Sequence, residues 1–229
     1  MFFMRKLLLL SISLIAFAFA HSQSGLSDSA RNAKKDSTLK AAMHEDSVKI
    51  NKQFSEMEKW DKIFAIAQYP LIKGAKMGGV IPVKDPTEIP DRNIQYKLLL
   101  ELVQRNPDSL MKDVDGSLSE VARIINLHIE SGIPAKQILP VLIVHGPALH
   151  AITNNESYQQ KFKMDNPNMA LLGELRKAGA KFIACGQAMA FLDIKKEALL
   201  PDVKVSVTAQ TVLSAYQLKG YVLKRIEVE

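Results

Sequence analysis

The sequence predicts a doubly wound α/β domain, with a mostly parallel sheet of about five strands and helices on both faces, in flavodoxin-like layering. Three observations predict it. Apolar runs of strand length alternate with helical stripes after Pro90, the connections between them are short, and Gly, Pro or Asn marks the breaks. The composition, 47% hydrophobic and 24% charged over 229 residues, provides enough apolar surface for such a core.

The strands are predicted from apolar runs bounded by turn residues. Leu139–Val144 is the clearest, because an unbroken apolar run is typical of a strand buried on both faces. The five predicted strands are Ile94–Val103, Leu139–Val144, Lys181–Cys185, Val203–Val207 and Tyr221–Ile226.

Helical stripes and helix-ending glycines lie between these strands. In the first helix, Ser117 and Glu120 have the spacing of a capping box, which predicts that the helix begins at Ser117. The predicted helices are Ser117–Ile129, a short helix from Ala148, Met169–Lys177, a stretch from Gly186, and Thr208–Leu218.

Residues 1–20 are predicted to be a signal peptide. Arg5 and Lys6 precede an apolar stretch that ends in Ala18-Phe19-Ala20, a small-x-small cleavage site, and the stretch is too short to span a bilayer. We therefore expect an exported protein, periplasmic or secreted, that begins near His21 and keeps no stable membrane insertion after cleavage. An uncleaved anchor is the alternative.

The rest of the chain divides by composition. Residues 21–60 are polar, with sparse apolar residues, and are predicted to be a tether that is helical or coil. Residues 61–92 are predicted to be an arm and edge segment, because Gly74–Pro90 is rich in glycine and proline. Residues 93–229 form the predicted α/β domain.

The net charge and the cysteine content argue against nucleic-acid binding and against an internal disulfide. Arg5 and Lys6 are the only charged residues in 1–20, so cleavage lowers the formal charge from +6 to +4. No basic stripe with interleaved aromatic residues is present, so we expect no nucleic-acid partner. Cys185 is the only cysteine, so no internal disulfide can form.

Cys185 is the leading candidate for a catalytic residue. It ends a predicted strand and directly precedes a predicted helix, where free N–H groups and the positive end of the helix dipole favour a thiolate. The alternative is a small core hydrophobe, which is what most lone cysteines are.

Other polar groups follow neighbouring predicted strands. His145 follows Val144 and is predicted to accept the thiol proton or to pair with the thiolate. The predicted ligand-binding residues are Gly146, Gly186, Gln187 and Thr208. The alternatives are a turn histidine for His145 and a simple helix cap for Thr208. No metal site or cofactor is expected, and His128 and His150 are interpreted as surface or packing residues.

Several motifs together resemble the DsrE/DsrF-like family of sulfur-relay proteins, which includes small YchN-like proteins. They are Val144–Ala148, Tyr158, Asn166–Asn168, Leu175–Gly179, Cys185–Gln187, Val203–Val212 and Gly220-Tyr221. The resemblance spans 95–226. It implies an α/β domain that assembles into homotrimers or hexamers, with Cys185 carrying sulfur as a persulfide received from, or passed to, a partner protein.

Three functions remain open on these grounds. The first is a sulfur carrier or sulfurtransferase that uses Cys185. The second is an exported module that binds a small ligand without catalysis. The third is a structural oligomer whose polar segment docks a partner.

Overall fold

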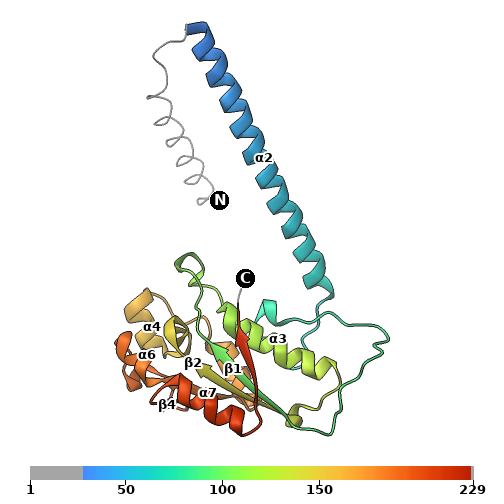
Figure 1. The fold of residues 1–229 in the computed structure, drawn as a ribbon, viewed down its shortest axis with the longest axis vertical. Helices are drawn as coiled ribbons and strands as arrows, with labels where there is room; N and C mark the ends of the chain where they lie inside the picture. The colour runs from blue at the N-terminus through green and yellow to red at the C-terminus, as the bar shows by residue number, and fades with distance from the viewer. Residues whose placement is uncertain (1–27, 228–229) are drawn as a thin grey trace. The chain divides into compact units, whose positions relative to one another are not determined.

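A computed structural model describes residues 28–227, so the predicted signal peptide lies outside the described residues. The chain divides after Asp61 into two compact units. The first holds most of helix α2 (Asp28–Ile66), and the second, from Lys62 onward, holds the α/β domain (Figure 1).

The sheet has the strand order β4-β3-β2-β1-β5, and all four pairings are parallel. The predicted parallel α/β fold is therefore confirmed. The strands are β1 (Tyr96–Leu102), β2 (Ile138–Val144), β3 (Lys181–Cys185), β4 (Lys204–Ser206) and β5 (Val222–Ile226).

Helical crossovers join successive strands, as parallel pairing requires. They are α3 (Gly116–Glu130), the 3₁₀ helix η5 (Gly146–Ile152) with α4 (Asn155–Phe162) and α5 (Met169–Lys177), α6 (Gly186–Phe191), and α7 (Ala209–Leu218). The first four strands progress in one direction, and α7 then returns the chain to the far side of β1, where β5 pairs.

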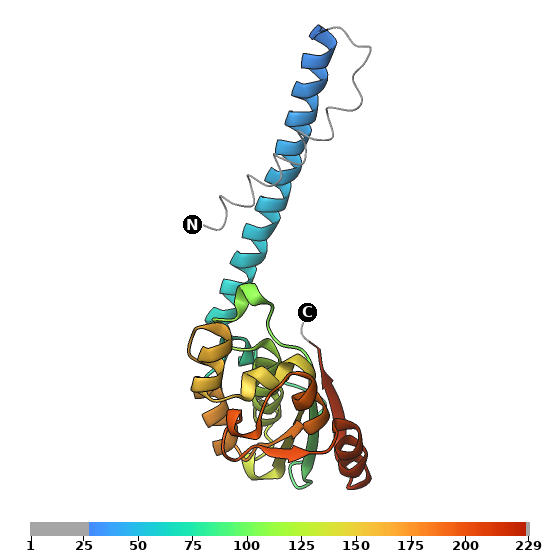
Figure 2. The ribbon, with the colours of Figure 1, turned by 90° about the vertical axis from the view of Figure 1, so that its left-hand side faces the viewer.

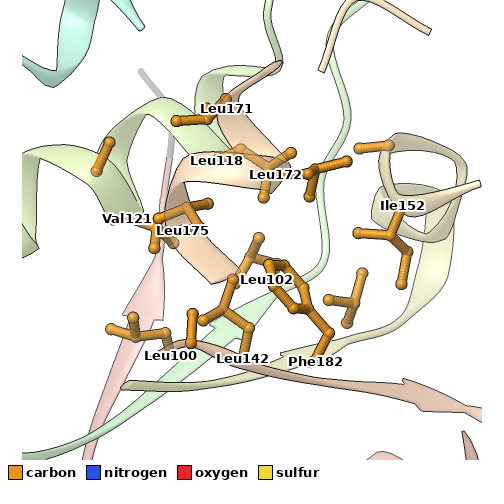
Figure 3. Close-up of a cluster of buried hydrophobic side chains, with 14 of the residues drawn as sticks. Leu100, Leu102, Leu118, Val121, Leu142, Ile152, Leu171, Leu172, Leu175 and Phe182 are labelled. Carbon is orange, nitrogen blue, oxygen red and sulfur yellow. The ribbon is translucent and has the colours of Figure 1, made fainter. Parts of the chain in front are cut away.

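Two apolar clusters cover the two faces of the sheet. In the larger one, side chains from α3 and α5 pack onto alternate residues of β1, β2 and β3 (Figure 3). The smaller one lies under α7, whose Ala209 and Leu213 pack on Leu99, Ile143 and Ile183. The helices thus lie on both faces, with α7 covering the second face.

Helix α3 begins one residue earlier than predicted, and its cap is different. Asp115, not Ser117, is the N-cap: its carboxylate accepts hydrogen bonds from the N–H groups of Ser117 (3.0 Å) and Leu118 (3.3 Å). Glu120 instead pairs with Arg123 at 2.6 Å. The capping box was wrong because the aspartate two residues earlier reaches the same free N–H groups.

The segment before the domain is one continuous helix in the structure, α2, which can be followed in Figures 1 and 2. Over the residues described here, no helix combines the length and the apolar character needed to cross a membrane. Residues after Ile66 form an irregular segment in which Gln68 and Val80 exchange backbone hydrogen bonds of 2.8 and 2.9 Å.

Candidate functional site

The strand order places three predicted site residues at one edge of the sheet. Cys185 ends β3, His145 follows β2, and Thr208 lies two residues beyond β4. Because β4, β3 and β2 are consecutive neighbours and parallel, their carboxyl ends meet at this edge. Ligands of open α/β sheets bind at such an edge.

Cys185 is buried, with 5% of its surface exposed, among apolar residues beneath α7. Its Sγ accepts a hydrogen bond from the backbone N–H of Ala209 at 3.2 Å. Ala209 is the first residue of α7, so the sulfur lies at the positive end of that ten-residue helix. The sequence pointed to the helix after Cys185 as the source of this field, whereas the hydrogen bond comes from α7.

Thr208 is the N-cap of α7, and its Oγ1 accepts a hydrogen bond from Gln210 N–H at 3.3 Å. This is the helix-capping role. By fixing the first turn of α7, the cap also fixes the Ala209 N–H that points at the sulfur. A ligand-binding role for Thr208 stays a prediction.

His145 is held by a buried carboxylate. Its Nε2 lies 3.0 Å from Oε1 of Glu101, whose surface is only 1% exposed. The other oxygen, Oε2, accepts a hydrogen bond of 2.9 Å from Nε of Arg225 on β5. The backbone N–H of His145 donates to Leu102 O at 3.0 Å, which fixes the residue against β1.

Burial raises the pKa of the Glu101 carboxyl, but the hydrogen bonds from Arg225 and His145, with the charges of both, outweigh this and leave the pKa below its ordinary value. Glu101 is therefore ionised at neutral pH and can only accept hydrogen bonds. It follows that Nε2 of His145 carries a proton, which leaves Nδ1 for a second partner.

These groups form a row on the face covered by α7. Val144 pairs with Ala184, so His145 and Cys185, the next residues, lie level on strands whose backbones are about 5 Å apart. Glu101 pairs with Arg225 across β1 and β5. The order across the sheet is thus Cys185, His145, Glu101, Arg225.

Sequence reasoning missed Glu101 and Arg225. A usable signal was present for Glu101, since it is the only charged residue in the apolar run Leu98–Val103. Buried carboxylates are rare unless they are paired, so this glutamate implied a cationic partner. Arg225 had no such signal, because it is an exposed residue among other exposed residues on an edge strand.

The two predicted glycines are required by close backbone approach. A Cβ on Gly186 would lie 2.7 Å from Ser206 O, and Gly146 has a φ of +56° with Val103 O 3.2 Å from an added Cβ. Both let neighbouring chains approach at the site edge. The N–H of Gln187 donates to Val207 O at 3.1 Å, so the fold already uses this donor.

The other two histidines of the α/β domain, His128 and His150, have partners outside this row. His150 is buried and packs edge-on against Phe162, and Nδ1 of the half-buried His128 lies 2.7 Å from Ile124 O. Among residues 28–227, no group of three or more His, Cys, Asp or Glu side chains is arranged to hold a metal ion.

The fold and this edge define a parallel α/β domain with a single thiol at the carboxyl end of a central strand. Residues 117–224 match the model of the DsrE/DsrF-like family. The match confirms the family resemblance that the motifs of the α/β domain predicted. The matched range contains His145 and Cys185, whereas Glu101 and Arg225 lie just outside it.

One solved structure similar to this chain is that of the protein of unknown function MTH1491 from Methanobacterium thermoautotrophicum. The two are 14% identical, the match covers 57% of this chain and 99% of that chain, and the TM-score is 0.44. No curated protein matches the chain.

Proposed function

We propose that the domain carries sulfur as a persulfide on Cys185. The observation that carries the proposal is the hydrogen bond from Ala209 N–H to Cys185 Sγ at the amino end of α7, in a family whose members relay sulfur. An N–H group aimed at sulfur stabilises the thiolate more than the thiol, and the thiolate is the nucleophile. The apolar surroundings of the sulfur oppose this effect.

The step needs only a donor that holds sulfane sulfur, such as a persulfide R–S–SH. The Cys185 thiolate attacks the outer sulfur, a new S–S bond forms to Cys185, and the S–S bond of the donor breaks. The products are Cys185–S–SH and the donor thiolate RS⁻, so atoms and charge balance. The reverse reaction with an acceptor thiolate would pass the sulfur on.

His145, which follows the neighbouring strand, is proposed as the base that removes the thiol proton. A nucleophile next to a base that is oriented by a third group is the arrangement by which enzymes activate weak nucleophiles. Here Glu101 is the orienting group, since it fixes Nε2 of His145.

The test is the intact mass of the protein after incubation with inorganic polysulfide, for wild type and Cys185→Ser. We expect a gain of about 32 Da that reductant removes and that the variant lacks. The same spectra report whether residues 1–20 have been removed from protein isolated from the periplasm, which tests the proposed export.

A binding module without catalysis is favoured by one observation, the 5% exposure of Cys185. The rate of alkylation separates the two functions. A thiol that reacts with iodoacetamide in the native state supports sulfur transfer, and a thiol that reacts only in denaturant supports a packing role. Trimers or hexamers, which the family resemblance implies, are part of the proposal and are measured by light scattering.

A further inference from the structure

Helix α2 carries an apolar stripe that is exposed along its length. Leu39, Met43, Ile50, Phe54 and Met57 are each between 36% and 64% exposed. At 3.6 residues per turn, these five positions fall within about 60° of one another around the helix axis. Polar residues occupy most of the other positions.

The spacing in this stripe is that of a helix–helix seam. Met43, Ile50 and Met57 recur every seven residues, and Leu39 and Phe54 flank them. A strict seven-residue repeat keeps one face turned toward a partner helix, whereas packing on a globular surface requires no such period. Packing of a stripe, more than intrinsic propensity, is what stabilises a helix of this kind.

We propose that α2 pairs with α2 of a second copy of this chain, in antiparallel orientation. The charges at the two heptad positions that flank the stripe select this partner and this direction, because they are basic up to residue 49 (Lys35, Lys40, Lys49) and acidic after it (Glu56, Asp61). Two copies of such a helix are complementary in charge when they run in opposite directions.

The register follows from the heptad positions. When Ile50 of one copy faces Gln53 of the other, Lys49 lies beside Glu56 of the second copy, and Lys40 lies beside its Asp61. Two-fold symmetry repeats each pair. A parallel pair would instead place Glu56 beside Asp61 and Lys35 beside Lys40, so like charges would meet.

Polar residues within the seam restrict the registers in which the two helices can pair. Asp46 and Gln53 occupy seam positions, and buried polar groups in a coiled coil lower its stability while fixing its register. The helix also contains its own pairs, with Lys49 2.7 Å from Glu45 and Lys59 4.0 Å from Glu56. Because the polar seam residues and these competing ion pairs both weaken the pairing, we expect the two helices to associate reversibly.

The orientation can be measured in the full chain. In a Cys185→Ser background, a single cysteine at Ala41 or at Asn51 takes a nitroxide label, and double electron–electron resonance gives the distance between the two copies. Both positions lie outside the stripe. In the antiparallel pair, labels at 41 are offset by about 30 Å along the axis, and labels at 51 by about 2 Å. We expect a long distance at 41 and a short one at 51.

Equal distances at the two positions would show a parallel pair and overturn the proposal. If no distance between copies is detected at either position, the stripe has a different occupant, such as a lipid surface or another protein, and the proposal also fails. A trimer formed only by the α/β domain does not produce this difference between the two labels.

Charge reversal tests the specific contacts. Lys49→Glu places two acidic groups together, and we expect the dissociation constant of the pair to rise about tenfold by sedimentation. Adding Glu56→Lys restores the complementary pair and the affinity. Lys52→Glu, on the other side of the helix, is the matched control and leaves the affinity unchanged. If the double variant binds as weakly as Lys49→Glu alone, these contacts are not made.

Discussion

Among the individual side chains at the carboxyl edge, Glu101 determines how the His145 ring is held. Its two oxygens accept hydrogen bonds from different donors, His145 on one side and Arg225 on the other. A carboxylate that is almost fully buried requires such partners, since an unpaired charge there would be strongly unfavourable. The arrangement therefore couples the ring of His145 to strands β1 and β5.

Replacing Glu101 with Gln should slow the reaction of Cys185. A glutamine side chain has an NH₂ group in place of one carboxylate oxygen, so it cannot accept from His145 and Arg225 on two separate oxygens. His145 therefore loses its fixed orientation. We expect the rate of alkylation and of sulfur loading at pH 7 to fall about tenfold, with a changed pH profile of the alkylation rate. The profile matters because a purely structural loss would lower the rates without changing its shape.

The matched control is Glu120→Gln. Glu120 also pairs with an arginine, Arg123, but it lies on α3, which packs on the other face of the sheet from Cys185. Its variant should react at the wild-type rate. Equal rates for Glu101→Gln and wild type would show that Glu101 has no part in the thiol chemistry.

For individual residues, the sequence could predict which strand ends carry reactive groups, but it could not predict every partner of those groups. Cys185 and His145 were found because each directly follows an apolar run. The Ala209 N–H was not, because it reaches the sulfur only through the pairing of β3 with β4. Such a contact depends on tertiary structure, which local sequence pattern does not contain.

Among the helices and connecting segments, Asn126 of α3 fixes the irregular segment that precedes the sheet. Its Oδ1 accepts from Leu71 N–H (3.1 Å) and Ile72 N–H (2.8 Å), and its Nδ2 donates to Ile72 O and Gly78 O, both at 2.8 Å. The side chain is fully buried. One residue thus satisfies four backbone groups that the segment cannot pair internally.

The variant Asn126→Leu should lower the free energy of unfolding by about 3 kcal/mol or more, because it leaves these backbone groups without partners. Urea unfolding followed by circular dichroism measures the change. Asn93→Leu, at an exposed asparagine, is the control and should change the stability by less than about 0.5 kcal/mol. A small effect at Asn126 would mean that water replaces the side chain.

The elements differ in how well their sequences predicted them. Short apolar or β-branched runs bounded by turn residues located all five strands to within about two residues, which is the ordinary error at element ends. Helix α4 had no strong signal, because Asn155–Phe162 is largely polar and only Tyr158 is buried. For most of helix α2 the sequence predicts only helix or coil, because the apolar stripe is sparse and most of the other residues are polar.

For the complete domain, the site depends on strands that are distant in sequence. The family match covers residues 117–224, yet the pair that joins β1 to β5 is formed by Glu101 and Arg225, one before and one after that range. The alternation of strands and helices predicted the class of fold. It did not predict that β5 would pair with β1, because the order of strands follows from where α7 packs.

The stability of the domain should fall as the pH is lowered from 6.5 to 4, and His150 should account for part of the fall. Burial, followed by the charges of Lys161 and Arg105, lowers the pKa of His150 from 6.5 to about 4. Between these values the unfolded chain binds a proton that the folded domain does not, so the unfolded state gains stability as the pH falls. The expected contribution is roughly 2 kcal/mol.

Protonation of two carboxyl groups at low pH also changes the stability of the domain, and the two effects have opposite signs. Glu101 has a lowered pKa, so its contribution is present above pH 4.5 and is lost as the pH falls through the lower value of the folded state. Burial raises the pKa of Asp115, so its protonation in the folded state relieves a penalty.

Urea unfolding from pH 4 to 7 for wild type and His150→Leu isolates the histidine, and His44→Leu, in exposed α2, is the control. If His150→Leu keeps the wild-type slope between pH 4 and 6.5, then His150 binds its proton equally in both states, and the burial of its ring has no electrostatic cost.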